Sequence, residues 1–191
     1  AYDDSGGAIA ARLWWMLQWL GHEKSMLLDG GWEQWKHEER PCSGKRESER
    51  KGEFNAKSPK PWIFDAEQIS PSMKNGEILL LDVRNSSRFR GEKEPIDPIA
   101  GHIPGAKNEP FQVNLDSNGL WKKGKDLLRQ YLERFPELEQ KKCVIYCGSG
   151  VTACHTFFAL KEAGFNNHSI YPGSWSEWIS DPSRPIAVGE E

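Results

Sequence analysis

Hydrophobic residues in the second half of the chain fall into a pattern of strands that alternate with helices. Residues 78–83 are a nearly continuous apolar run, which suits a buried parallel strand. Residues 65–73 are consistent with a short helix, and residues 125–135 have apolar side chains at helical spacing. The side of this second helix that is expected to face the core comprises Leu127, Leu128, Tyr131, Leu132 and Phe135.

Closer to the C-terminus, the pattern continues around a tight turn formed by Gly148 and Gly150. The predicted elements there are a strand at 143–146, a helix at 153–163 that ends at Gly164, a strand at 168–171 and a short helix that opens at Gly173. Strands in alternation with helices predict an α/β fold, a doubly wound parallel sheet, for residues 62–191.

The N-terminal segment repeats part of this pattern. Residues 3–35 align without a gap onto residues 146–178 at a constant offset of 143, and the bulky pair Trp14-Trp15 falls on Phe157-Phe158. The identical pairs are Gly7/Gly150, Ala10/Ala153, Leu17/Leu160, Gly21/Gly164, Gly30/Gly173, Trp32/Trp175 and Trp35/Trp178. Each copy is predicted to contain a turn, a helix, a short strand, another turn and a short helix.

The repeat suggests a division of the chain. We expect residues 1–39 to be the C-terminal half of a second copy, residues 40–61 to be a charged linker, and residues 62–191 to be a complete domain. The first copy would then lack about 78 opening positions, roughly half a domain. The helix expected over residues 8–20 would lose the strands that cover its apolar residues, which are Trp14, Trp15, Leu17 and Trp19. It should therefore promote association, be covered by a separate segment, or pack on another surface, including that of a homodimer partner.

Composition excludes several functional classes. Hydrophobic residues make up 37% and charged residues 28% of the chain, the net charge is −3, and no basic stripe is present. Binding to nucleic acid or to a membrane is therefore not expected. Four cysteines without a secreted disulfide pattern indicate a reducing compartment, the cytoplasm or a mitochondrion.

The segment Cys147-Gly148-Ser149-Gly150-Val151-Thr152 has the features of a thiol site, because it lies between a predicted strand and a helix N-terminus. Glycines let successive N–H groups point inward, and the helix dipole adds partial positive charge. Such a loop favours a nucleophilic thiolate and would hold a transferred anionic sulfur. The alternative is a structural cysteine. A cysteine phosphatase would need an arginine six positions later, where Ala153 stands.

These residues resemble the tandem-domain rhodanese family of 3-mercaptopyruvate and thiosulfate sulfurtransferases. The loop Cys147-Gly-Ser-Gly-Val-Thr-Ala is similar to that of the mercaptopyruvate enzymes. Further matching segments, in family order, are Leu81-Asp82-Val83-Arg84, Arg88-Phe89-Arg90-Gly91, Gly101-His102-Ile103-Pro104-Gly105-Ala106 and Gly173-Ser174-Trp175. The resemblance extends over essentially the whole chain and implies a rhodanese-like fold.

The resemblance also implies roles for individual residues. Cys147 would become a persulfide, Ser149 would polarise the donor or assist proton transfer, and Arg88 would bind the donor's carboxylate. The remaining loop residues, Gly148, Gly150, Val151 and Thr152, would surround the sulfur. Asp82, Arg84 and His102 would support the loop from below. Ser149 could instead serve the turn and Arg88 a surface ion pair, while Cys154 is either a redox partner or a buried small residue.

The identity of the sulfur donor stays open at this stage. The mercaptopyruvate enzymes carry a second arginine at the position of Asp97, where thiosulfate-using relatives have an acid; those relatives also have basic residues at the positions of Gly148 and Ser149. No cofactor or metal is implied. The expected partners are a small sulfur donor and a thiol acceptor such as thioredoxin or glutathione, with cyanide as an alternative acceptor.

A second interpretation is a non-catalytic rhodanese-like module used for binding or regulation. In the family, the first domain is a catalytically silent copy with an acid in place of the cysteine, and Asp4 aligns with Cys147. Such modules lose the cysteine, so the presence of Cys147 favours an enzyme. The family's active site also uses an acid and a histidine from the front half of the first domain, which residues 1–39 do not include.

Overall fold

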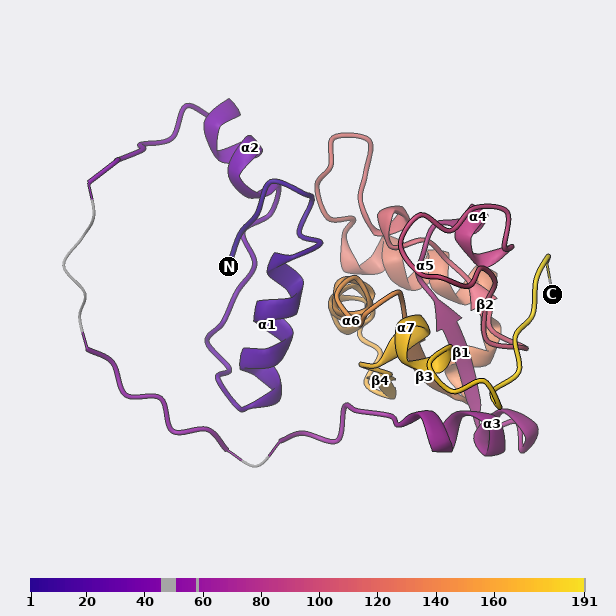
Figure 1. Cartoon of the computed structure of the whole chain (residues 1–191). Helices are drawn as coiled ribbons and strands as arrows, with labels where there is room; N and C mark the ends of the chain where they lie inside the picture. The colour runs from indigo at the N-terminus through magenta and orange to yellow at the C-terminus, as the bar shows by residue number, and fades with distance from the viewer. Residues whose placement is uncertain (46–50, 58, 191) are drawn as a thin grey trace.

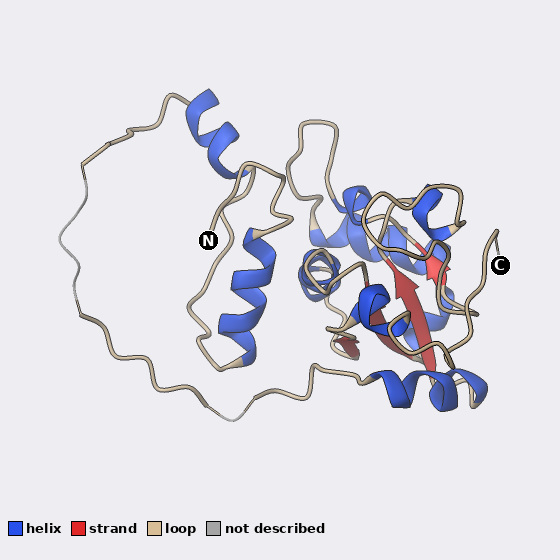
Figure 2. Cartoon of the chain, viewed as in Figure 1, coloured by secondary structure: helices blue, strands red, loops and turns tan. Residues whose placement is uncertain are grey.

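The computed structural model describes residues 1–45, 51–57 and 59–190. A four-stranded parallel sheet lies at its centre, in the order β2-β1-β3-β4. The strands are β1 (Ile78–Asp82), β2 (Lys107–Asn108), β3 (Lys142–Tyr146) and β4 (His168–Ile170). Helices lie on both sides of the sheet (Figures 1 and 2), which confirms the predicted doubly wound α/β fold.

The predicted helices all form, and a short helix at Ser86–Phe89 forms in addition, which the sequence pattern did not predict. The helices are α1 (Ala10–Trp19), α2 (Gly31–His37), α3 (Ala66–Lys74), α4 (Ser86–Phe89), α5 (Gly124–Arg134), α6 (Ala153–Glu162) and α7 (Ser174–Trp178), with 3₁₀ turns at Phe111–Asn114 and Pro136–Glu139. One detail of α5 is wrong in the prediction, since Leu128 is 37% exposed. The helix turns only a narrow stripe inward, so that Leu127 and Tyr131, one turn apart, are its buried residues.

Strand alternation divides the interior into two cores, because successive side chains of a strand point to opposite faces of a sheet. Leu79 and Leu81 of β1 pack with α1, α5 and α6 on one face. Ile78 and Leu80 pack with α3 and α7 on the other. The register pairs Asp82 with Tyr146, so β1 and β3 end at the same edge of the sheet. Loops that follow these strands therefore meet there.

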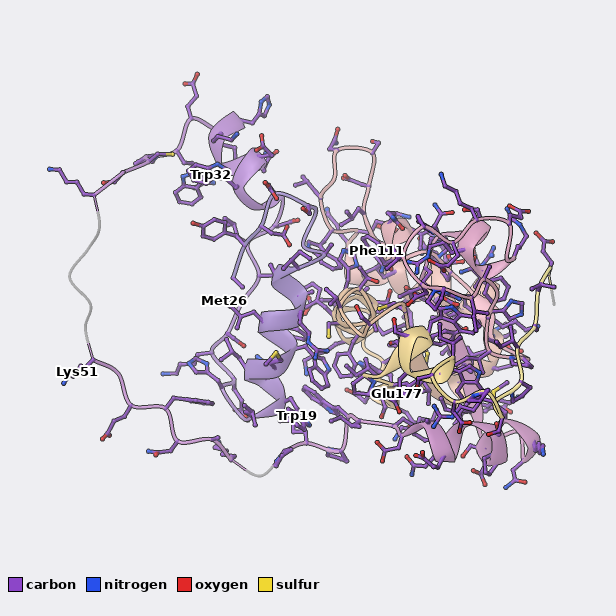
Figure 3. All side chains as sticks on the ribbon, viewed as in Figure 1. Trp19, Met26, Trp32, Lys51, Phe111 and Glu177 are labelled. Carbon is purple, nitrogen blue, oxygen red and sulfur yellow. The ribbon has the colours of Figure 1, made fainter. Side chains whose placement is uncertain are left out.

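The N-terminal segment packs on the rest of the same chain. Helix α1 lies beside α6 (Figure 1), and Trp14 meets Phe158 edge to face at 4.9 Å. Trp14 and Trp15 are buried, so of the expected outcomes the helix takes the one in which it packs on another surface, here α6 of the same chain. The sequence does not reveal this packing because the partner surface lies more than 130 residues away. The opposite side of α1 remains exposed at Ile9, Leu13 and Met16, and Met26 lies on that side as well (Figure 3).

The strand expected in the first copy does not form. Residues 25–28 make two backbone hydrogen bonds to Ala1, from the terminal amine to Met26 O and from Leu28 N to Ala1 O. A strand requires a continuous ladder with a neighbour, and the described residues provide only these two bonds.

The predicted linker, residues 40–61, has no helix or strand at 40–45, 51–57 or 59–61, and residues 46–50 and 58 lie outside the described residues. Its last part follows the end of α1, where Lys57 N donates to Leu20 O and Trp19 Nε1 donates to Lys60 O. Figure 3 shows Trp19 at this junction. Within the described ranges, no helix is long and apolar enough to cross a membrane.

The contact between α1 and α6 leads to a stability prediction. Trp14→Ala should lower the free energy of unfolding by about 3–5 kcal/mol, because a buried aromatic ring is lost and a cavity remains. Leu13→Ala, one residue earlier on the exposed side, should change it by about 0.5 kcal/mol or less. Urea unfolding followed by circular dichroism measures both. Equal effects of the two substitutions would contradict the observed packing.

Candidate functional site

The loop of residues 147–153, called the Cys147 loop below, follows β3 and ends in the first turn of α6 at the carboxyl edge of the sheet. Cys147 is buried, Gly148 is half-buried and Ser149 is exposed. The structure thus brings the predicted loop residues together at one edge. The hydroxyl of Ser149 makes no hydrogen bond within the described part of the chain and is free to meet a ligand.

The backbone of the Cys147 loop presents donors without acceptors. The N–H groups of residues 148 to 153 donate no hydrogen bond to any of the residues that the structure describes. The loop's carbonyls, in contrast, point outward: Trp175 N donates to Cys147 O at 3.0 Å and Ser176 N to Gly148 O at 2.9 Å. In a planar trans peptide, the N–H of the next residue points away from the carbonyl. The loop therefore has the form of an anion-binding nest.

Neighbouring elements fix this conformation. Gly150 has a φ of +75°, and a Cβ atom there would come 2.4 Å from Pro172 O, so glycine is required. Ser174 accepts a hydrogen bond from Cys147 N at 3.1 Å and donates one to Tyr171 O. The start of α7 thus binds both the backbone N–H and the backbone carbonyl of Cys147.

A buried ion pair lies beneath α7. Arg84 binds both carboxylate oxygens of Asp82, with the shortest distance at 2.7 Å, and donates to Gly101 O. Its guanidinium carbon lies 4.7 Å from the centre of a Trp175 ring. Asp82 and Arg84 therefore brace the helix that holds the Cys147 loop. His102 is also buried. Its ring stacks on Phe89, and its Nδ1 lies 2.8 Å from Phe89 O.

Arg88 lies against the opening of the loop. A Cβ atom on Gly148 would be 3.6 Å from Arg88 Nη2. The guanidinium is already held by two acids, at 2.7 Å from Glu94 and 3.0 Å from Asp97. Burial raises the pKa of Glu94, but hydrogen bonds from Arg88 and the backbone outweigh it and leave that pKa below its usual value. Nη1 of Arg88 has no partner among the described residues and remains available.

Two other cysteines are poor candidates for the nucleophile. Burial raises the pKa of the Cys143 thiol to about 12, and burial does the same for Cys154 although the nearby Arg12 acts in the opposite direction. Both thiols therefore stay protonated at neutral pH. Cys147 is the cysteine that the loop surrounds.

The first copy contains the same kind of loop in an occupied form, residues 3–10, called the Asp3 loop. The carboxylate of Asp3 accepts hydrogen bonds from four backbone N–H groups at 2.7–2.9 Å, those of Ser5, Gly7, Ile9 and Ala10. Burial raises the Asp3 pKa, but these donors outweigh it and hold the pKa below its usual value. Within this chain, a loop of this type therefore binds an anion.

The structure corrects the register of the repeat. Trp32 N donates to Asp3 O, whereas the matching bond in the second copy runs from Trp175 N to Cys147 O. Asp3, not Asp4, therefore takes the place of Cys147, and Asp4 is exposed. The Asp3 loop contains one extra residue. The ungapped alignment missed it because its identities lie almost entirely in the helices and turns that follow.

The sequence alone did not identify Glu94, Ser174 and Ser176 as part of the site. Ser176 Oγ donates to Asp97 at 2.7 Å and lies 2.8 Å from Gly148 O, so it connects the acid to the loop. The available signals were the acid cluster that follows Arg88 and the family segment Gly173-Ser174-Trp175. Among the described residues, no group of three His, Cys, Asp or Glu side chains is placed to hold a metal.

The occupied Asp3 loop can be tested by substitution. Asp3→Asn should lower the free energy of unfolding at pH 7 by about 1–2 kcal/mol, because an amide nitrogen would face backbone donors. The folded pKa of Asp3 is lowered, so its contribution is present above the usual value of 3.8 and is lost as pH falls through the folded value. The difference from wild type should therefore shrink in acid. Asp4→Asn is the matched control, and a larger effect there would restore the original register.

Comparison with known proteins agrees with this geometry. The rhodanese-like domain family matches residues 1–38 and 65–181. A Pseudomonas aeruginosa protein named "Probable 3-mercaptopyruvate sulfurtransferase" is 45% identical over 99% of this chain and 67% of its own length. The human 3-mercaptopyruvate sulfurtransferase is 38% identical over 98% of this chain and 63% of its own length. The chicken thiosulfate sulfurtransferase is 32% identical over 93% of this chain and 61% of its own length.

The chain thus spans about two thirds of the length of the curated relatives it matches. Among solved structures, the wild-type structure of EanB superposes with a TM-score of 0.86 at 21% identity, over 100% of this chain and 48% of that one. This likeness shows the fold alone. The family match and the curated relatives together show that the chain belongs to the rhodanese-like family.

Proposed function

We propose that the chain is a sulfurtransferase that moves a sulfur atom from 3-mercaptopyruvate to a thiol through a persulfide on Cys147. The observation that carries this proposal is the row of N–H groups at residues 148–153, around a cysteine, which donate to none of the residues that the structure describes. A persulfide is anionic, and the Asp3 loop indicates how such a row receives negative charge. The sulfurtransferase names of the relatives support the same reaction class.

The reaction balances with the groups at the site. The Cys147 thiolate attacks the sulfur of 3-mercaptopyruvate, an S–S bond forms, and the C–S bond breaks with its electron pair going to carbon. That carbon takes the proton of the donor thiol, and pyruvate leaves. In this proposal Ser149, which is exposed at the loop, relays the proton. An acceptor thiol then takes the outer sulfur and regenerates the thiolate. Thioredoxin and glutathione, of the cytoplasm or mitochondrion, have suitable thiols, and cyanide could accept the sulfur as well.

The charges around Arg88 favour 3-mercaptopyruvate over thiosulfate. One cation at the loop opening faces two carboxylates, Glu94 and Asp97, and the loop's own side chains there are neutral. A dianion would find little countercharge, whereas a single carboxylate needs only the free Nη1 of Arg88. Asp97 weakens even this contact, because its negative charge lies beside Arg88, at the position where the family's mercaptopyruvate enzymes have a second arginine.

The first 39 residues fit the same proposal as the back half of a silent copy. Their loop is filled by its own acid, so it has no place for a transferred sulfur. The non-catalytic alternative would apply to that copy, whereas Cys147 in an open loop makes the second copy the reactive one.

The persulfide can be observed directly. Incubation with 3-mercaptopyruvate should add one sulfur mass to the peptide that contains Cys147, as measured by mass spectrometry without reductant. Cys147→Ser should abolish the addition, whereas Cys154→Ser should retain it because that thiol stays protonated. Sulfur found on Cys143 or Cys154 in the wild-type chain would refute the assignment of the nucleophile.

The role of Asp97 can be tested by steady-state kinetics. Asp97→Asn removes a negative charge but keeps an oxygen for Ser176, so KM for 3-mercaptopyruvate should fall about fivefold, which corresponds to about 1 kcal/mol. Asp126→Asn, an exposed acid on α5, is the control and should leave KM unchanged. Wild-type turnover with thiosulfate that exceeded that with 3-mercaptopyruvate about tenfold would overturn the donor assignment.

A further inference from the structure

Helices α1 and α6 contact each other as equivalent partners. Trp14 packs against Phe158 at 4.9 Å, and Trp15 packs against Phe157 at 6.1 Å, both edge to face. At the repeat offset of 143, Trp14 corresponds to Phe157 and Trp15 to Phe158. Each aromatic pair is thus the other's counterpart. The contact has the reciprocal form of a two-fold interface, although it lies within one chain.

The reciprocity extends to the two loops. Arg12 of α1 donates from Nη1 to Gly150 O in the Cys147 loop at 3.0 Å. Its counterpart on α6 is His155, whose Nε2 lies 3.1 Å from Gly6 O in the Asp3 loop. The register that pairs Asp3 with Cys147 has an offset of 144 at the start of the loop, so Gly6 and not Gly7 corresponds to Gly150 there. Each helix therefore places one side chain on the same carbonyl of the other copy's loop.

The two donors differ in charge. Burial lowers the pKa of His155 to about 4, although the contact to Gly6 and the charge of Asp3 act in the opposite direction. His155 is therefore neutral at pH 7 and donates through Nε2 to a carbonyl. Arg12 carries a full positive charge under all ordinary conditions. No carboxylate pairs with Arg12 within the residues that the structure describes, and the face of Trp15 lies 5.8 Å from its guanidinium.

The difference matches what each loop must hold. The Asp3 loop contains a permanent carboxylate, and the neutral His155 is a sufficient donor to the carbonyl of Gly6 in that loop. The Cys147 loop must hold a negative charge that appears with the thiolate and moves with the persulfide. A cation bonded to Gly150 O polarises the peptide to Val151, whose N–H points the opposite way, toward the inside of the loop. Charge-assisted hydrogen bonds of this kind are stronger than neutral ones.

We propose that Arg12 is a positioning residue for sulfur transfer, which acts through Gly150 to strengthen the anion-binding N–H groups of the Cys147 loop. This role rests on the proposed function of Cys147. Arg12 contacts the loop through the carbonyl of Gly150, so in this proposal it affects the rate of reaction at the bound sulfur more than donor binding. The Sγ of Cys154, 3.4 Å from Gly150 O, remains as a neutral donor when Arg12 is replaced. Substitution therefore removes charge without leaving that carbonyl unpaired.

Two measurements on the full chain test this role. The first is the rate of Cys147 alkylation by iodoacetamide at pH 7, followed by peptide mass spectrometry, which requires no sulfur transfer. The second is kcat and KM with 3-mercaptopyruvate. Arg12→Met should lower both the alkylation rate and kcat about tenfold, with KM unchanged. Arg12→Lys keeps the charge and should stay within about threefold of wild type.

Melting temperatures separate positioning from folding. Arg12→Met and Arg12→Lys should melt at similar temperatures while they differ in alkylation rate. His155→Gln removes the counterpart contact and should lower the melting temperature while it leaves the alkylation rate within about twofold of wild type.

An alkylation rate for Arg12→Met equal to wild type, or an equal loss in the methionine and lysine variants, would overturn the role of Arg12. A loss of the same size in His155→Gln would overturn it too, because the interface and not the charge would then control the thiol. If the wild-type chain forms no persulfide, the proposed function fails, and the alkylation rates still decide whether Arg12 activates Cys147.

Discussion

The conformation of the Cys147 loop depends on one constraint, that the backbone N–H groups of residues 148–153 meet no acceptor among the residues that the structure describes. Such an arrangement is unfavourable unless the outward carbonyls are well bonded and negative charge can occupy the centre. The start of α7 bonds the first carbonyls, and Gly150 allows the backbone to turn. The buried pair of Asp82 and Arg84 holds α7 in turn, through Trp175. Each support of the site thus serves the same row of donors.

The two copies use one loop design for opposite purposes. In the Asp3 loop, a carboxylate from the chain itself fills the donors, so that loop is a stable structural unit. In the Cys147 loop, a thiol stands at the corresponding position, and our proposal assigns the N–H donors to the anionic sulfur that the reaction forms. With the roles that we propose for Cys147 and Arg12, the contact between α1 and α6 makes the occupied copy a support for the reactive one. A segment that carries no nucleophile can in this way contribute to the chemistry.

The sequence predicted the longer helices and strands because burial and periodicity are local properties, but it did not predict the short elements α4 and β2. The apolar run before Asp82, the helix after Cys147 and the glycine turns all appear where expected. Arg88, which follows β1, and the Cys147 loop, which follows β3, meet at one edge because these parallel strands end together. The sequence could not reveal the extra residue of the Asp3 loop, which only the hydrogen bonds of Trp32 and Trp175 expose. It also could not reveal which surface covers Trp14, since that depends on how distant helices pack.

The central claim is that the N–H groups of residues 148–153 hold the transferred sulfur as the Asp3 loop holds its carboxylate. A crystal structure of the chain after reaction with 3-mercaptopyruvate tests it most directly. The account predicts that the outer sulfur on Cys147 lies within hydrogen-bonding distance of several of these N–H groups, at the position that corresponds to the Asp3 carboxylate oxygens. An outer sulfur that points away from the loop, while those N–H groups bind another partner, would contradict the account.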